Sequence, residues 1–129
     1  MVRSAVVLVG RCASRLVAMV VVGFLAAGCG SSGTTGPDGN TPGQNEIWLQ
    51  NTAFVPSAKT ISMGTTITWT NKDSFNHTVT SGTPGNPDGK FASGSLAQNG
   101  TFPHTFNQAG TFPFYCTIHP SMQGTITVQ

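Results

Sequence analysis

The sequence predicts an all-β domain in which two sheets pack face to face. From residue 46 onward, short runs rich in β-branched and aromatic residues alternate with turn residues, and no stretch keeps helical spacing. Several of these runs have a period of two, with apolar residues on one face and threonines on the other. About seven or eight strands in roughly 84 residues favour a Greek-key β-sandwich over a barrel or an open sheet.

The strands are expected in chain order between clear turn signals. Gly64, residues 71–73 and residues 108–110 carry glycine, asparagine or aspartate and separate apolar runs. The resulting prediction places strands near residues 46–50, 59–63, 65–70, 76–81, 100–106, 111–116 and 123–129.

Three further features complete the expected fold. Residues 81–93 hold three glycines and two prolines, so we predict a long connection between the two halves of the sandwich, without chemistry of its own. Trp48 and Trp69 occupy apolar positions of alternating runs and are predicted to be core residues.

The first 28 residues have the pattern of a secretory signal peptide. Arg3, Arg11 and Arg15 precede an apolar run that ends in small residues just before Cys29. This ending resembles the bacterial lipobox, so we predict a lipoprotein signal peptide over residues 1–28 and lipidation of Cys29. Plain secretion with a spare cysteine is the alternative.

Residues 29–45 are predicted to be a Gly/Ser/Thr/Pro-rich tether, and the folded domain is expected over 46–129. Beyond Cys29 the chain has three lysines and four acidic residues, so its net charge is −1, whereas the whole sequence has +2. This balance gives no reason to expect nucleic-acid binding.

The predicted signal peptide and lipidated Cys29 together indicate where the protein acts. We expect an extracytoplasmic monomer held at a membrane, on the periplasmic side or at the cell surface.

A candidate metal site lies near the C-terminus. Cys116, His119 and Met122 follow one another at three-residue intervals, and His77 offers a second imidazole. Soft sulfur donors combined with imidazole suit copper that cycles between Cu(I) and Cu(II). Cys116 has no evident disulfide partner, because Cys12 lies in the predicted signal and Cys29 is the predicted lipid site. An inert buried cysteine is the alternative for Cys116 alone.

Residues 71–77 and 110–124 together resemble the small type 1, or blue, copper proteins of the cupredoxin family, within the plastocyanin and amicyanin group. The two residues between His119 and Met122 match the short amicyanin-type loop. The resemblance implies one copper ion held by His77, Cys116 and His119, with Met122 as a weak axial ligand.

The resemblance also implies a contact between the two ligand-bearing loops. In the family, an asparagine six residues before the first histidine hydrogen-bonds towards the residue after the cysteine, which makes Asn71 and Thr117 the expected pair. The alternative is that Asn71 is only a turn residue. Asn76 and Ile118 stand where relatives often have proline, and their effect on the site is left open.

The remaining polar candidates are given structural roles. His104 has the strand parity of its phenylalanine neighbours, so we predict a half-buried structural histidine in preference to a ligand. Asp73 and Asp88 are predicted to be solvated turn residues, since no nucleophile and base stand in register with them.

These observations favour a single-electron carrier that is not an enzyme and that meets transient redox partners. Copper storage or delivery is the alternative, although the sequence has no Met-rich or His-rich tract. Copper enzymes of this fold need further histidines, and only His104 is spare. Zinc is chemically possible on the His and Cys donors, but a thioether is an unusual zinc ligand. A sandwich that had lost its metal would lack a ligand, and none is missing.

Overall fold

The computed structural model describes residues 39–129. The predictions of a signal peptide over residues 1–28 and of lipidation at Cys29 lie outside the described residues, as does most of the predicted tether. Between residues 39 and 129 there is no helix that is long and apolar enough to cross a membrane.

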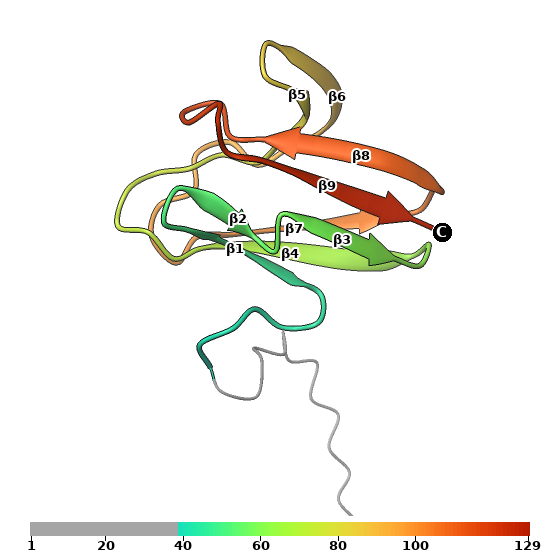
Figure 1. The fold of residues 1–129 in the computed structure, drawn as a ribbon, viewed down its shortest axis with the longest axis horizontal. Helices are drawn as coiled ribbons and strands as arrows, with labels where there is room; N and C mark the ends of the chain where they lie inside the picture. The colour runs from blue at the N-terminus through green and yellow to red at the C-terminus, as the bar shows by residue number, and fades with distance from the viewer. Residues whose placement is uncertain (1–38) are drawn as a thin grey trace, which may run out of the picture. The chain divides into compact units, whose positions relative to one another are not determined.

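Within residues 39–129, nine strands form two sheets that pack against each other, which confirms the predicted sandwich (Figure 1). One sheet has the order β2-β1-β4-β7 and the other the order β3-β9-β8-β5-β6. The strands are β1 (Glu46–Gln50), β2 (Ala53–Val55), β3 (Ala58–Ile61), β4 (Thr65–Asn71), β5 (Thr80–Thr83), β6 (Asn86–Ala92), β7 (Thr101–Phe106), β8 (Gly110–Tyr115) and β9 (Gln123–Val128).

The core lies between the sheets and is built from the apolar face of each alternating strand. Trp69 is fully buried at its centre and has Phe91, Phe102, Phe106 and Phe114 around it, with ring centroids 5.4–6.3 Å from its own. This confirms the prediction for Trp69. Burial of such rings supplies much of the apolar contact that holds the sheets together.

Trp48 is also buried, as predicted, but it does not belong to this core. Its neighbours Ile47 and Leu49 point into the sandwich, so Trp48 points to the opposite face of β1. There the Lys72 ammonium lies 4.5 Å from the centroid of its ring, a cation–π distance.

The prediction for residues 81–93 was wrong, because this segment forms most of the β5–β6 hairpin at the edge of the second sheet. Edge strands are held by backbone hydrogen bonds on one side only, and they tolerate proline and polar side chains that hide them from pattern analysis. The expected strand 76–81 correspondingly begins later, at Thr80. The crossing to the first sheet follows β6.

Two smaller differences concern the N-terminal part of the domain. The three-residue strand β2 was not predicted, because only Phe54 faces the core and so short a run has no visible period. Ordered contacts also begin before Glu46: Gly43 is buried, and its carbonyl accepts the Glu46 N–H at 3.1 Å.

The topology brings the two predicted ligand loops to one end of the sandwich. Strand β4 ends at Asn71 and β8 ends at Tyr115, and the loops that follow them lie at the same end, on the left in Figure 1. The turn between β7 and β8 lies at the opposite end. The candidate site is therefore built from loops that the sheets hold in place.

Candidate metal centre

His77, Cys116 and His119 meet at this end of the molecule. One ligand atom from each lies within 4.8 Å of the others. The Cys116 Sγ is 3.8 Å from His77 Nδ1 and 3.9 Å from His119 Nδ1. His77 and Cys116 are fully buried, and His119 is partly exposed. Three donors thus face a common point, as the sequence predicted.

Each end of His77 is fixed by a separate contact. Its backbone forms an isolated bridge with Leu96, with N–H···O distances of 3.1 and 2.8 Å. Its ring directs Nδ1 towards Cys116, while Nε2 lies 2.9 Å from Oδ2 of Asp73. The ring therefore has little freedom to turn.

Asp73 was predicted to be a solvated turn residue, and that prediction was wrong. Besides His77, its carboxylate accepts the backbone N–H groups of Asn51 at 2.8 Å and Thr52 at 3.0 Å. Burial raises the pKa of Asp73, but the hydrogen bonds from Thr52, Asn51 and His77 outweigh this effect and lower the pKa from 3.8. The sequence signal that could have indicated Asp73 is its position four residues before His77.

The surroundings of Cys116 favour its thiolate. Burial raises the pKa of the thiol, but hydrogen bonds to Sγ, led by that of the Thr78 N–H at 3.3 Å, lower the pKa from 9.0 to about 6. The thiolate is the form that binds metals.

The loop that carries Cys116, His119 and Met122 is closed by its own backbone. The Cys116 N–H donates to the Met122 carbonyl at 3.0 Å, and the Met122 N–H donates to the His119 carbonyl at 2.9 Å. Met122 is 2 % exposed, so its side chain is packed inside the protein. Its role as the axial ligand remains a prediction.

The structure does not show the predicted contact between Asn71 and Thr117. Asn71 instead donates to the carbonyls of Phe75 at 2.8 Å and Leu96 at 2.9 Å, and accepts the Asp73 N–H at 2.9 Å. Asn71 therefore shapes the loop that leads to His77, which is more than the alternative of a simple turn residue.

The link between the two loops comes from Thr78. Its Oγ1 accepts the Thr117 N–H at 2.7 Å and lies 2.9 Å from the Thr117 Oγ1. Residue types alone could not show whether Asn71 or Thr78 contacts Thr117. The partner depends on how the loop between Asn71 and His77 turns back on itself.

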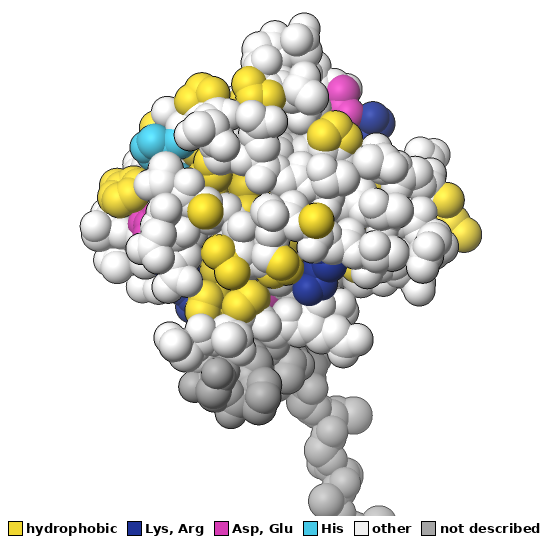
Figure 2. Space-filling model, viewed as in Figure 1, with side chains coloured by type: hydrophobic (Ala, Val, Ile, Leu, Met, Phe, Trp, Pro, Cys, Tyr) yellow, Lys and Arg dark blue, Asp and Glu magenta, His cyan; other side chains and the backbone are white. Residues whose placement is uncertain are grey.

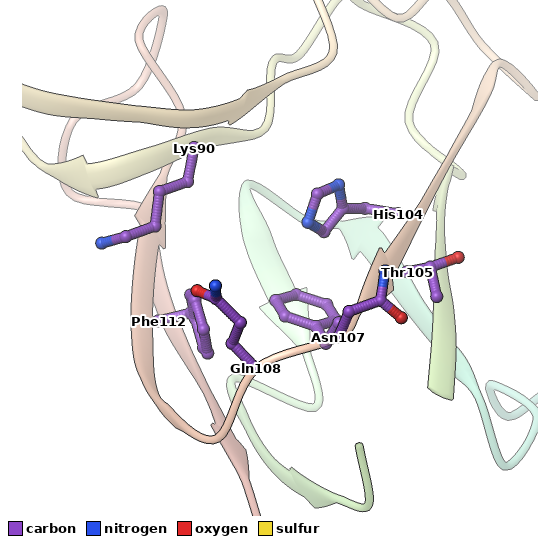
Figure 3. A pocket seen from close by; sticks show the side chains of 7 residues that line it. Lys90, His104, Thr105, Asn107, Gln108 and Phe112 are labelled. Carbon is purple, nitrogen blue, oxygen red and sulfur yellow. The ribbon is translucent and has the colours of Figure 1, made fainter. Parts of the chain in front are cut away.

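His104 lies away from the donor cluster, as predicted. It is partly buried on β7, and its ring packs near those of Phe91, Phe102 and Phe106, with centroids 4.7–6.5 Å away. An open pocket adjoins it, and in Figure 3 the His104 ring and the Lys90, Gln108 and Phe112 side chains face this space. Burial lowers the pKa of His104 from 6.5.

Apolar side chains surround the exposed part of the cluster. Phe75 is 46 % exposed and Ile118 49 % exposed, and the Phe75 ring centroid lies 5.7 Å from that of His119. Figure 2 shows a histidine at the surface with hydrophobic side chains beside it. The surface beside His119 therefore includes exposed apolar side chains.

A β-sandwich with one buried thiolate between two imidazoles at its end defines a class of proteins that hold a single metal ion. The donor set fits copper, because the cysteine sulfur and the two imidazole nitrogens lie within 4.8 Å of one another and combine a soft donor with two borderline ones. When bound there, copper supplies one-electron chemistry through the Cu(I)/Cu(II) couple.

The chain belongs to the plastocyanin/azurin family of copper-binding proteins, whose family model matches residues 43–129. Amicyanin-alpha of Methylorubrum extorquens is 29 % identical over 117 residues, which cover 91 % of this chain and 95 % of that relative. Family and site together support copper-based electron transfer as the general function.

Two solved structures illustrate the range of proteins with this fold. A purple cupredoxin from Nitrosopumilus maritimus is 31 % identical, with a TM-score of 0.61 over 65 % of this chain and 98 % of its own. A copper-containing nitrite reductase from Thermus scotoductus is 26 % identical, with a TM-score of 0.60 over 68 % of this chain but only 23 % of its own.

Proposed function

We propose that this protein is a single-electron carrier in which His77, Cys116 and His119 hold one copper ion and Met122 is a weak axial ligand. The observation that carries the proposal is the convergence of one thiolate and two imidazoles at a buried point with their positions already fixed. The amicyanin relative supports the same function.

Rigid ligands are what such a carrier needs. Cu(I) and Cu(II) prefer different geometries, so ligands that cannot move keep the rearrangement on electron transfer small. Here His77 is held by Leu96 and Asp73, and Cys116 is held by Thr78 and by the closed backbone of its own loop. The loops that make these contacts follow directly after the ends of strands β4 and β8.

The route for the electron is proposed to pass through His119. This histidine is the partly exposed member of the cluster, and Phe75 and Ile118 beside it offer an apolar contact surface with little charge. Redox encounters use small interfaces that form and separate quickly. We propose that donor and acceptor proteins dock here in turn.

The N-terminal segment supports a proposal for the protein's location. We propose that Cys29 carries a lipid and that the chain acts outside the cytoplasm as a membrane-anchored monomer. The Gly/Ser/Thr/Pro-rich residues between Cys29 and the folded domain are proposed to be a tether that lets the domain turn between two partners at the same membrane.

We further propose that the protein is not an enzyme. The nitrite reductase that shares its fold is a much longer protein, and this chain covers 23 % of it. In the described part of this chain, His104 is the one histidine outside the donor cluster, and it packs among phenylalanines. The described residues therefore offer no second group of histidines for a further copper site.

The absorption and EPR spectra of the purified protein loaded with Cu(II) test the electron-carrier proposal. An intense thiolate-to-copper band with narrow hyperfine splitting is expected, and Cys116→Ser should abolish the band. Reversible one-electron reduction should follow at an electrode. Weak absorption and ordinary tetragonal EPR parameters that survive Cys116→Ser would contradict the proposal and favour copper storage.

A further inference from the structure

Asp73 has hydrogen-bond partners at both of its carboxylate oxygens and at its backbone N–H. Its Oδ1 accepts the Asn51 N–H, and its Oδ2 accepts the Thr52 N–H and faces His77 Nε2. Its own N–H donates to the buried Asn71 side chain. The carboxylate is therefore held from three directions.

The two-residue turn of the β1–β2 hairpin supplies two of these donors. Asn51 and Thr52 join β1 to β2, and both have positive φ, 55° and 57°. Asparagine tolerates this conformation, but it is unfavourable for a β-branched residue such as threonine. The turn directs two successive backbone N–H groups, those of Asn51 and Thr52, at the Asp73 carboxylate.

The carboxylate determines which nitrogen of His77 carries the proton. Because a carboxylate only accepts hydrogen bonds, Nε2 of His77 must donate to Oδ2, and in the neutral ring Nδ1 is left with its lone pair directed towards Cys116. A carboxylate in this position also makes an imidazole a stronger donor to a metal.

We propose that Asp73 is the positioning residue of the metal centre: it fixes Nδ1 of His77 as the ligand atom and favours Cu(II) over Cu(I). The inference rests on the proposed function above. A negative charge behind one ligand stabilises the more highly charged ion, so the loss of this charge raises the reduction potential. Asp73 does not touch the metal and acts only through His77.

The experiment compares Asp73→Asn and Asp73→Ala with Asp88→Asn, which removes the same charge from the β6 strand, where Asp88 pairs with Lys90. Cu(II) affinity relative to Cu(I) is expected to fall about 10- to 100-fold in Asp73→Ala. Each tenfold change raises the potential by about 59 mV for one electron. Asp73→Asn should lie between Asp73→Ala and the wild type, and Asp88→Asn should match the wild type.

A second readout uses the metal-free protein, so it does not depend on the copper assignment. Two-bond ¹H–¹⁵N correlation spectra report the tautomer of each imidazole. His77 should be a pure Nε2–H tautomer in the wild type and a mixture in Asp73→Ala, and urea unfolding of each variant checks that it folds. An unchanged tautomer together with an unchanged potential in a folded Asp73→Ala variant would overturn the proposal. If the wild type lacked the thiolate–copper band but His77 kept its tautomer, the proposed function alone would fail.

Discussion

Single hydroxyl and amide groups do much of the positioning at the metal centre. The Thr78 side chain bridges the two loops, and its N–H contacts the sulfur that is expected to bind the metal. Asn71 uses both ends of its amide to fold the loop before His77. Because Thr78 and Asn71 are buried, each lost contact would leave a polar group without water to replace its partner.

His104 gives the protein a dependence on pH that is independent of the metal. Burial lowers the folded-state pKa of His104 below its unfolded value of 6.5. Between the folded and the unfolded pKa, the unfolded chain therefore binds more protons than the folded protein. Stability is therefore expected to fall as the pH drops through this window, and the loss is complete below the folded pKa. Lys90, which lines the same pocket, adds a positive charge on that side.

His104→Gln removes this contribution. Urea unfolding of the metal-free protein at pH 8 and pH 5 should show a smaller loss of stability on acidification in the variant than in the wild type. Gln108→Ala in the same pocket, which does not titrate, is the matched control. Equal losses of stability in His104→Gln and the wild type would show that His104 does not cause the pH dependence.

Among the elements, the β5–β6 hairpin depends on the shape of its backbone. Pro84 and Gly85 form its two-residue turn, with Gly85 at φ 82°, the combination that a type II turn requires. Gly82 pairs with Pro87 at φ 110°, and a Cβ there would overlap the backbone of residues 86–88. The hairpin therefore has no room for a side chain at Gly82.

Gly82→Ala should destabilise the domain by about 2–3 kcal/mol, because strain at positive φ adds to the overlap. Gly85→Ala is the matched control: it has a similar strain, but nothing lies within 4 Å of its added methyl group. It should cost about 1 kcal/mol. Urea unfolding measures both, and equal losses would show that the close approach at Gly82 is unimportant.

At the scale of the whole molecule, aromatic packing joins the two sheets. Phe114 from β8 reaches across to Phe54 of β2, with ring centroids 4.7 Å apart, and to Trp69 of β4 at 5.4 Å. Its ring also lies directly over Gly124, where a Cβ would collide with it. Phe114 thus contacts both layers of the sandwich.

Phe114→Ala is expected to cost about 3–5 kcal/mol, because it leaves a cavity between the sheets. Val55→Ala, at a position that is 37 % exposed, should change the free energy of unfolding by less than about 1 kcal/mol. Denaturant midpoints distinguish these outcomes. A loss below 1 kcal/mol for Phe114→Ala would mean that the sheets are joined elsewhere.

The sequence predicted the sandwich and the donor cluster well, for a physical reason. Alternation of apolar residues reflects burial, so strands with one core face, such as β4 and β9, were found nearly at their bounds. The β6 strand, which is exposed along most of its length, has no such pattern. Chemically distinctive residues such as Cys116 also stood out, whereas the contacts of Asn71 and Asp73 depend on loop geometry that residue types do not encode.

The position of β9 has a consequence for how the protein is made. This strand lies between β3 and β8 and pairs in parallel with β3, which precedes it by more than sixty residues. A growing chain on the ribosome cannot complete this sheet until residues 123–128 have emerged. Cys116 and His119 can meet His77 in their final arrangement only then, so we expect the newly made polypeptide to acquire its metal after synthesis of the domain has finished.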